Sequence, residues 1–399
     1  MKTCRICSFP IEPFIDFGKM PIANGFLAKE QFSSEYFYDM ELAFCEGCLM
    51  VQLVEQPDRD MLFHENYAFY SSTSKAMAEH FEEFANDVIE QYSPEFVVEI
   101  GSNDGIMLRH FKGVRHLGIE PSANVAEVAR KNGINTTSVF FDEISANSIV
   151  EDYNQADVIL AANVMCHISD IHSVMSGVEN LLSPDGVLIF EDPYLGDIIE
   201  KTSYDQIYDE HVFYFSLNSV ISLVQRHGLE VINVEHQEVH GGSMRYTIAH
   251  MGKYPKSPNV LDLLMDEYVK GFEKKEMYLG FKSNVQSSKD SLIDRLRKIK
   301  QSGGRIVGYG ATSKSSTITN FCGIGPELID YICDTTPIKQ VKFSPGVHIP
   351  VKPYLEFVQD NPTHALLFAW NHKAEIMAKE QDYKGKWIVY VPEVKLLES

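Results

Sequence analysis

Between residues 74 and 193 the spacing of apolar positions switches repeatedly between that of a helix and that of a strand. The segment 74–92 (SKAMAEHFEEFANDVIEQY) has the spacing of an amphipathic helix, and the short apolar run FVVEI follows it and ends in a glycine turn. The alternation continues with the strand-like runs HLGIEPS, ADVILAANV and VLIFEDP, which are separated by the helical segments NVAEVARKNG and IHSVMSGVENLLSPDG. Alternating strands and helices predict a parallel, doubly wound α/β sheet with its ligand site at the carboxyl ends of the strands.

A second α/β unit is predicted towards the end of the chain. After a helical segment at 216–228, two apolar runs, LEVINVEHQEV and SMRYTIAHM, flank HGG and predict an antiparallel hairpin that closes the first sheet. GKYPKSPN has the composition of a linker, a long helix is expected to about residue 302, and GGRIVGYGATSKSSTITNF starts a new strand, glycine turn and helix. LIDYICDTTP, THALLFAWNH and KWIVYVPEV supply further strands. We therefore expect three domains, over 1–70, 71–252 and 253–399.

The first 70 residues show little helical periodicity and contain four of the seven cysteines. CRIC and CEGC form two C-x2-C pairs, which in a reducing compartment imply a thiolate metal site more readily than disulfides. Four thiolates suit tetrahedral Zn²⁺ and leave no coordination position open, so a structural zinc ion in a small metal-organised module is predicted. The alternative is two unrelated buried pairs. The expected ligands are Cys4, Cys7, Cys45 and Cys48.

Composition narrows the class of partner. The chain has 399 residues, 44% of them hydrophobic and 23% charged, and it offers no apolar window of the roughly 18 residues that a membrane span needs. It also lacks a basic segment followed by an apolar one at its start, so a cytoplasmic, globular protein without a membrane partner is expected. The formal net charge of −21 disfavours nucleic acid, and we interpret the basic run RLRKIK (295–300) as a solvated helix face. We expect a small-molecule substrate and a monomer or small homo-oligomer.

The glycine turn EIGSNDG follows the first predicted strand and carries the main cofactor signal. Gly101 permits the tight turn, and Gly105 permits close approach of the backbone to a ligand. Glu120 ends the next strand, where a carboxylate can accept hydrogen bonds from ribose hydroxyls. This geometry serves either NAD or S-adenosylmethionine, but the turn lacks the third glycine of the pyrophosphate fingerprint. Glu99 and Asn103 complete the candidate cofactor residues of this turn.

VVEIGSNDG, LGIEPS, DVILAANV and NLLSPDGVLIFEDP, in this order, resemble the successive motifs of a class I S-adenosylmethionine-dependent methyltransferase. The resemblance implies that Gly101 lies along the methionine and ribose of the cofactor and that Glu120 binds the ribose. It further implies that Asp142 meets the adenine amine and that Asn163 closes the pocket. Asn103 replaces the middle glycine of the commoner motif, which leaves its contact open. An equal alternative for Asp142 is a helix cap before EISANS.

The resemblance extends over essentially the whole chain. A cysteine module with LMVQL and FHENYAFYSS, a core containing EDPYLGD and YDEHVFYFS, and the later segments GYGATSKS and DTTPIKQ resemble the nucleotide-sugar C-methyltransferases. In that family the substrate is a nucleoside-diphospho-4-keto-deoxysugar, usually dTDP-linked. The methyl group goes to the ring carbon beside the ketone, with C-3 as the expected position, in branched-chain sugar biosynthesis. The alternatives are O- or N-methylation of another small metabolite and a zinc scaffold that senses S-adenosylmethionine.

Carbon methylation needs a base beside a carbonyl and a donor for the enolate oxygen, and YDEHVFYFS (208–216) offers both. His211 best suits proton abstraction, and Glu210 or Asp209 could orient its imidazole. Tyr208 can donate to the developing enolate oxygen, and His167 is a second candidate acid or base.

The family's functional residues carry over at Tyr208, Glu210, His211 and His167. A tyrosine of NYAFY, either Tyr67 or Tyr70, is expected to reach the sugar. The bland alternative is that these are half-buried or turn residues without a function.

GYGATSKS places Gly308 and Gly310 on a second strand-to-helix turn. Backbone N–H groups at the helix start, together with Ser313, Lys314 and Ser315, make an anion site suited to a diphosphate. Asp334, at the end of the following strand, resembles the acid of a degenerate dinucleotide site. We therefore expect this domain to hold the nucleotide of the substrate through Gly310, Ser313 and Lys314, the alternative being a purely structural glycine turn.

Overall fold

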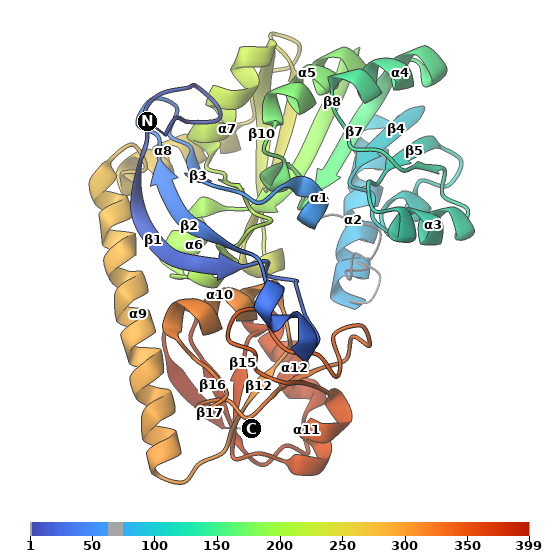
Figure 1. Cartoon of the computed structure of the whole chain (residues 1–399). Helices are drawn as coiled ribbons and strands as arrows, with labels where there is room; N and C mark the ends of the chain where they lie inside the picture. Colours follow the sequence, from blue (N-terminus) through green and yellow to red (C-terminus); the bar gives the residue numbers. More distant parts are fainter. Residues whose placement is uncertain (1, 63–74, 399) are drawn as a thin grey trace.

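The computed structural model of the protein describes residues 2–62 and 75–398. These residues form three β-sheets, and the long helix α9 (Lys275–Gln301) contacts the first of them and also the third (Figure 1). The predicted fold class is confirmed: a doubly wound α/β core with a small N-terminal module and a second α/β domain. No helix in this described part is long and apolar enough to cross a membrane.

The N-terminal module is a four-stranded antiparallel sheet in the order β1-β2-β3-β9. Its last strand comes from the middle of the chain, because β3 pairs with Phe213 and Tyr214. The module is therefore not built from the first 70 residues alone. Its elements are β1 (Glu12–Pro21), the 3-10 helix η1 (Lys29–Ser34), β2 (Phe37–Phe44), β3 (Val51–Leu53), α1 (Arg59–Leu62) and β9 (Phe213–Tyr214).

A seven-stranded sheet in the order β10-β11-β8-β7-β4-β5-β6 forms the centre of the molecule, with β4 to β8 in parallel. Alternate residues of β4 enter different hydrophobic clusters: Phe96 and Val98 pack with α4 and α5, whereas Val97 packs with α2. Both faces of the strand are buried, which explains why its sequence is apolar except at Glu99. The strands are β4 (Phe96–Ile100), β5 (Arg115–Ile119), β6 (Thr136–Thr137), β7 (Ala156–Ala162), β8 (Leu182–Pro193), β10 (Leu229–Gln237) and β11 (Ser243–His250).

Helices join the parallel strands of this sheet, as the alternating pattern predicts. The hairpin predicted around HGG is also present: β10 and β11 are antiparallel, and β11 pairs antiparallel with β8. The helices are α2 (Lys75–Tyr92), α3 (Ala123–Lys131), α4 (Glu143–Tyr153), α5 (Ile171–Leu181), α6 (Leu195–Glu200) and α7 (Leu217–Val224). The short 3-10 helices are η3 (Leu108–His110), η4 (Met165–His167), η5 (Tyr204–Gln206), η6 (Gln225–His227) and η7 (Val239–Gly241).

The third sheet has the order β14-β13-β12-β15-β16-β17 and is parallel except for its last strand. Although α8 follows the expected boundary at residue 252, it packs against β10 and α7 of the central unit. The three domain ranges therefore stay predictions. The strands are β12 (Ile306–Tyr309), β13 (Ile332–Asp334), β14 (Val351–Pro353), β15 (His364–Leu367), β16 (Lys386–Val389) and β17 (Lys395–Glu398). The further helices are α8 (Pro258–Lys270), α10 (Ser313–Cys322), α11 (Tyr354–Asp360), η8 (Trp370–His372) and α12 (Lys373–Lys379).

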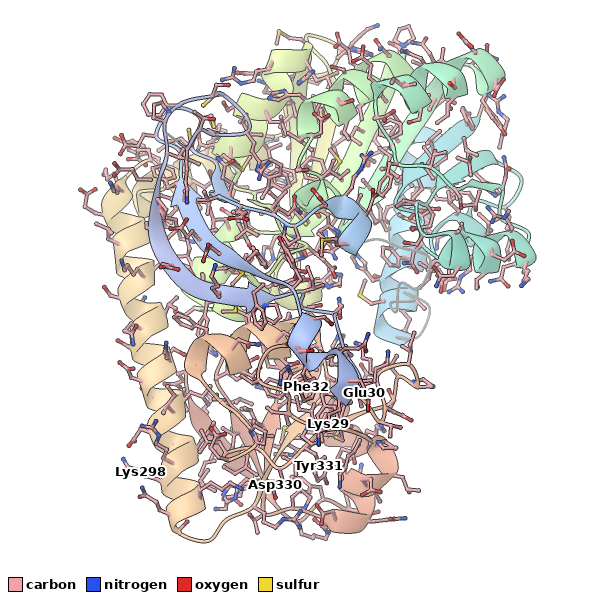
Figure 2. The ribbon with its side chains drawn as sticks, viewed as in Figure 1. Lys29, Glu30, Phe32, Lys298, Asp330 and Tyr331 are labelled. Atoms are coloured by element: carbon pink, nitrogen blue, oxygen red, sulfur yellow. The ribbon has the colours of Figure 1, made fainter. Side chains whose placement is uncertain are left out.

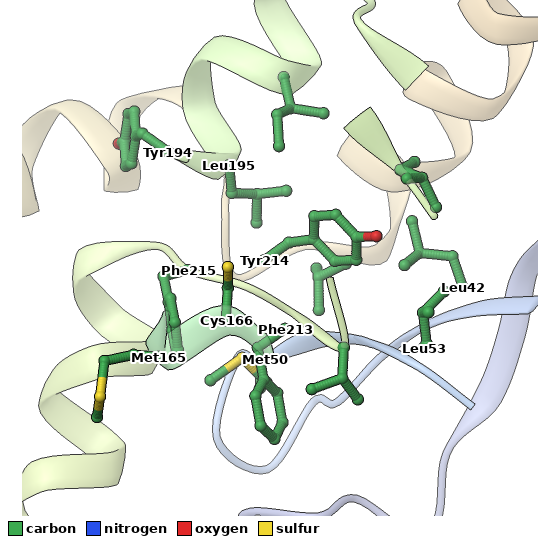
Figure 3. Packing of buried hydrophobic residues seen from close by; sticks show 14 of the residues in the cluster. Leu42, Met50, Leu53, Met165, Cys166, Tyr194, Leu195, Phe213, Tyr214 and Phe215 are labelled. Carbon is green, nitrogen blue, oxygen red and sulfur yellow. The ribbon is translucent and has the colours of Figure 1, made fainter. Parts of the chain in front are cut away.

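One hydrophobic core joins the N-terminal module to the central unit (Figure 3). Leu42 and Leu53 of the module belong to the same cluster of buried residues as Met165, Cys166 and Leu195 of the central unit. Each of these side chains is almost completely removed from solvent. Because the apolar surface is shared, the module cannot separate from the central unit without exposing it to water.

The module also packs against the C-terminal domain. Figure 2 shows Phe32 of η1 directed towards that domain, in which Tyr331 and Asp330 are labelled. The Phe32 ring stacks on the His348 imidazole with 3.6 Å between centroids, and the Glu35 carboxylate lies 2.7 Å from the same imidazole. The N-terminal module therefore lies between the two α/β units and contacts both.

Candidate active site

The four cysteines of the two C-x2-C pairs come together at the start of the N-terminal module. The Sγ atoms of Cys4 and Cys48 are 3.5 Å apart, those of Cys7 and Cys45 are 3.4 Å apart, and all four lie within 4.8 Å of one another. A zinc ion with tetrahedral Zn–S bonds of about 2.3 Å separates its sulfurs by about 3.8 Å, so this cluster fits the ion. Hydrogen bonds among these thiols lower the pKa of Cys4 and raise the pKa of Cys45 and Cys48, as expected when neighbouring thiols share protons.

A cavity of about 160 Å³ opens at the carboxyl ends of β4, β5 and β7. Gly101 follows β4 with a φ of +68°, and a Cβ at this position would come within 2.4 Å of Val164 Cγ2. The absence of a side chain therefore lets this turn pack directly against Val164 in the cavity wall. The candidate cofactor residues that line the cavity are Gly101, Asn103, Glu120 and Asn163.

The Glu120 and Asn163 side chains of this cavity differ in their hydrogen bonding. The Glu120 carboxylate accepts hydrogen bonds from the backbone N–H groups of Asn103 (3.0 Å) and Ser122 (2.8 Å), and burial raises its pKa. Asn163 has a φ of +56°, and its buried Oδ1 has no hydrogen-bond partner among the described residues. An open glycine turn, a strand-end acid and an unpartnered amide oxygen fit a cofactor with a ribose and an amino acid moiety, such as S-adenosylmethionine.

Three other candidate cofactor residues do not line the cavity. Glu99 is buried, and this burial raises its pKa well above the ordinary value. Gly105 permits close packing, because a Cβ at this position would come within 2.7 Å of Ile134. Asp142 is the N-cap of α4, and its Oδ1 accepts from the Ser145 N–H at 2.8 Å. The cap interpretation of Asp142 is therefore observed, and its contact with adenine stays a prediction.

Replacing Gly101 by Ala is expected to weaken binding of S-adenosylhomocysteine at least about tenfold. The new Cβ would clash with Val164 in the cavity wall, and alanine in the left-handed region also costs about 1–2 kcal/mol. Titration calorimetry would measure the affinity. Gly113→Ala is the matched control, because Gly113 has a φ of +82° but nothing within 4 Å of its Cβ. Equal affinities in the two variants would contradict the assignment of Gly101 to the cofactor cavity.

Tyr208 and His211 form a hydrogen-bonded pair. The Tyr208 hydroxyl lies 2.8 Å from His211 Nε2, and His211 Nδ1 lies 3.0 Å from the Gln206 carbonyl oxygen. Because a carbonyl can only accept, Nδ1 carries the proton and Nε2 accepts from the hydroxyl. Burial holds the pKa of His211 well below its ordinary value, with His167 as a second cause. His211 is thus a neutral imidazole whose basic nitrogen faces a phenol.

The two carboxylates beside His211 do not orient it, contrary to the expectation from the sequence. Asp209 accepts from the Ala23 backbone N–H at 3.2 Å, and Glu210 Oε1 accepts from the Asn24 amide at 2.7 Å. The Gln206 carbonyl holds the imidazole instead, because the chain between Gln206 and His211 turns back on itself. Both acids face the N-terminal module.

The His167 imidazole lines the cavity and stacks on His211 with ring centroids 5.0 Å apart. Burial lowers the pKa of His167 to about 3. The Gln56 side-chain amide donates to the carbonyl oxygens of both His167 (3.2 Å) and Asp209 (3.1 Å). A residue of the N-terminal module therefore fixes the loops that carry both histidines.

The glycine turn of the C-terminal domain faces this region. The Ser313 hydroxyl accepts from Asn24 at 2.8 Å, and the Lys314 ammonium donates to Asn371 Oδ1 at 3.1 Å and lies 4.7 Å from the Trp370 ring centroid. Burial lowers the pKa of Lys314. Gly310 has a φ of +88° and starts the turn.

Asp334 has a structural role at this turn. Its carboxylate accepts from the backbone N–H groups of Ala311 and Thr336, each at 2.7 Å, which holds the glycine turn in shape. The candidate substrate tyrosines, Tyr67 and Tyr70, lie outside the described residues.

The sequence analysis missed several residues at the junction of the three parts. Asn24 bridges Glu210 and Ser313, and its only sequence signal is the turn-like NG in PIANGF. Asp205, in the segment before YDEH, accepts from Trp370 Nε1 at 2.6 Å and from the Tyr390 hydroxyl at 2.7 Å. These contacts join residues far apart in the chain, so no local sequence pattern predicts them.

This fold, with a ligand cavity at the carboxyl ends of its parallel strands, is that of a class I S-adenosylmethionine-dependent methyltransferase. Three family models match successive parts of the chain. They are a zinc binding domain (residues 4–63), a methyltransferase domain (73–234) and a C-methyltransferase C-terminal domain (238–392). The chain is also 30% identical over 409 residues to the C-methyltransferase NovU of Streptomyces niveus, with 99% of this chain and 97% of that protein covered. The chain therefore belongs to the family of S-adenosylmethionine-dependent C-methyltransferases that carry an N-terminal zinc-binding domain.

The solved structures that are similar to this chain cover less than half of it, and their sequence identity to it is low. Magnesium protoporphyrin IX methyltransferase of Synechocystis PCC 6803 with bound S-adenosylhomocysteine is 9% identical, covers 43% of this chain and 82% of its own, and gives a TM-score of 0.34. An S-adenosylmethionine-dependent methyltransferase of Clostridium acetobutylicum is 12% identical, covers 44% and 92%, and gives a TM-score of 0.35. The family models and the relative NovU, rather than these structures, show that the enzyme uses S-adenosylmethionine, and its clustered cysteines offer four ligands to zinc.

Proposed function

We propose that this enzyme methylates the ring carbon beside the ketone, C-3, of a nucleotide-linked 4-keto-deoxysugar. One observation carries the proposal. The neutral imidazole of His211 and the Tyr208 hydroxyl lie beside the cavity-lining His167, and the glycine turn that carries Lys314 faces the same region. Acid–base groups and an anion-binding turn together suit an acceptor with an acidic carbon at one end and a diphosphate at the other.

The pair of Tyr208 and His211 suits formation of an enolate. In our proposal the Tyr208 hydroxyl turns from His211 Nε2 to the ketone oxygen when the sugar binds, which frees the Nε2 lone pair. Nε2 then takes the proton as the ring C–H bond breaks, and the electron pair moves into an enolate whose oxygen accepts from the same hydroxyl. His167 is the second candidate for the base, since its ring lines the cavity. S-adenosylmethionine supplies an electrophilic methyl group when bound, and the carbonyl re-forms as the carbon takes that methyl group. The Gln206 carbonyl keeps the proton on Nδ1, so that Nε2 stays basic.

The nucleotide end of the acceptor is assigned to the C-terminal domain. Gly310 lies in the turn before α10, and Ser313 and Lys314 begin that helix, where backbone N–H groups and an ammonium favour a phosphate. The relative NovU is named as a C-methyltransferase, which supports transfer to carbon. The proposal accounts for the C-terminal domain, which a small acceptor without a nucleotide would not need.

Mass spectrometry tests this function directly. Purified enzyme with S-adenosylmethionine and a dTDP-linked 4-keto-deoxysugar is expected to yield S-adenosylhomocysteine and a sugar heavier by one methyl group. In D2O with S-adenosylhomocysteine in place of the methyl donor, the proton at C-3 is expected to exchange, because only carbon methylation requires its removal. Methyl transfer to an oxygen or nitrogen, without exchange at carbon, would overturn the proposal.

A further inference from the structure

The turn between β10 and β11 places a histidine in an unusual backbone conformation. His240 has φ 56° and ψ 12°, in the left-handed region, and Gly241 and Gly242 follow it with φ of 92° and 124°. A Cβ on Gly241 would come within 2.5 Å of the Trp370 ring, and one on Gly242 within 2.2 Å of the Asp197 carboxyl carbon. The turn is therefore pressed between α6 and the C-terminal domain, and only glycines fit after His240.

The His240 side chain lines the cavity together with Asn163 and His167. Its electrostatic neighbours come from both α/β units, with Lys314 and His372 on one side and the pair of Glu191 and His80 on the other. Burial lowers the pKa of His240 to about 4, and Lys314 contributes to the same shift. The imidazole is therefore neutral and offers one donor and one acceptor. A hydroxyl group also donates and accepts hydrogen bonds, so it can pair with this ring.

Among the residues that the structure describes, the ring of His240 makes no hydrogen bond, ion pair or ring contact, whereas other half-buried and buried histidines do. His80 binds the Glu191 carboxylate at 2.7 Å, His172 binds the Ile6 carbonyl at 2.9 Å, and His211 binds the Gln206 carbonyl at 3.0 Å. A left-handed backbone at a non-glycine residue that aims an unused polar ring into a cavity points to a ligand contact.

We propose that His240 is a specificity-determining residue of the acceptor site, where its imidazole hydrogen-bonds an oxygen substituent of the sugar ring. This assignment rests on the proposed function. His240 stands between the cofactor cavity and Lys314, which is where the sugar must lie if its nucleotide is held by the C-terminal domain. A neutral imidazole discriminates a hydroxyl from hydrogen, because an acceptor without that oxygen leaves the ring unpaired.

The variant His240→Asn tests the assignment. Asparagine tolerates the left-handed backbone, so the turn is preserved while the ring is removed. We expect kcat/KM for the nucleotide-linked keto-sugar to fall about ten- to a hundredfold, which is the loss of one hydrogen bond in a desolvated site. The affinity for S-adenosylhomocysteine and the melting temperature are expected to stay at the wild-type values.

The matched control is His236→Asn. His236 lies on the same hairpin, but its side chain is 41% exposed and its partner is the Asp197 carboxylate at 2.7 Å, so its loss is expected to leave kcat/KM unchanged. Equal kcat/KM values in the two variants would overturn the His240 assignment alone. A parallel loss of S-adenosylhomocysteine affinity in His240→Asn would also overturn it, since the turn would then serve the cofactor. Wild-type enzyme that fails to methylate the keto-sugar would overturn the proposed function, and the His240 assignment would fall with it.

Discussion

His211→Gln is expected to lower kcat about 10²- to 10⁴-fold, which is the usual contribution of a positioned acid–base group. Glutamine is close in length to histidine but offers no basic nitrogen in place of Nε2, so the proton on the ring carbon has no acceptor. Exchange of that proton with D2O is expected to fall by the same factor. A discontinuous turnover assay would measure the loss of kcat, and mass spectrometry of the recovered sugar would measure the loss of exchange.

A histidine with the same kind of tether serves as the control for this variant. His116 Nδ1 lies 3.1 Å from the Val114 carbonyl, as His211 Nδ1 lies close to that of Gln206. Among the described residues, however, His116 has neither the hydroxyl partner nor the stacked imidazole that His211 has. His116→Gln is expected to keep wild-type turnover and exchange. If His211→Gln kept wild-type exchange in D2O, another group would be the base, and His167 would be the first to examine.

Removal of zinc is expected to abolish methyl transfer and to lower the melting temperature by more than about 10 °C. Structural zinc sites contribute on the order of 10 kcal/mol to the folding of small modules. Here the two C-x2-C pairs lie next to the strands of a sheet that includes β9, so loss of the ion is expected to destabilise that sheet. Loss of this sheet would release Gln56 and Asn24 from the loops that carry His167 and Glu210. Cys45→Ser, measured by metal analysis, calorimetry and turnover, tests this expectation.

Cys333→Ala is the control, because this thiol is buried in β13 and lies outside the zinc cluster. Its loss is expected to cost some stability but to leave zinc content and turnover unchanged. A zinc-free Cys45→Ser protein with wild-type melting temperature and turnover would show that the module neither needs the ion nor supports the catalytic loops.

Local patterns account for the parts of this molecule that were predicted correctly. The run FVVEI was recognisable as a strand because both its faces are buried, so four of its five residues are apolar and even Glu99 is removed from solvent. The glycine turn at Gly101 could be read because its backbone conformation excludes other residues. The spacing of Cys4, Cys7, Cys45 and Cys48 predicted their cluster, since few other arrangements satisfy four thiols.

The features that the sequence did not reveal depend on contacts between distant segments. β9 is only two residues long and takes its pairing from β3, so its own residues carry no signal for the N-terminal sheet. The carboxylates of Asp209 and Glu210 are adjacent to His211 in the chain but face the N-terminal module, because tertiary packing decides the direction of each side chain. Backbone carbonyls, such as that of Gln206, have no sequence signature at all.

The participation of β9 in the first sheet has a consequence for biosynthesis. The cysteines emerge early from the ribosome and can take up their metal while most of the chain is still unmade. The sheet beside them stays open at β3 until Tyr214 has left the exit tunnel, so a hydrogen-bonding edge is exposed during much of translation. The N-terminal sheet can be completed only when β9 is available, and β9 directly follows the segment that carries Tyr208 and His211. The zinc-binding part and the acid–base residues therefore reach their final structure in the same folding step.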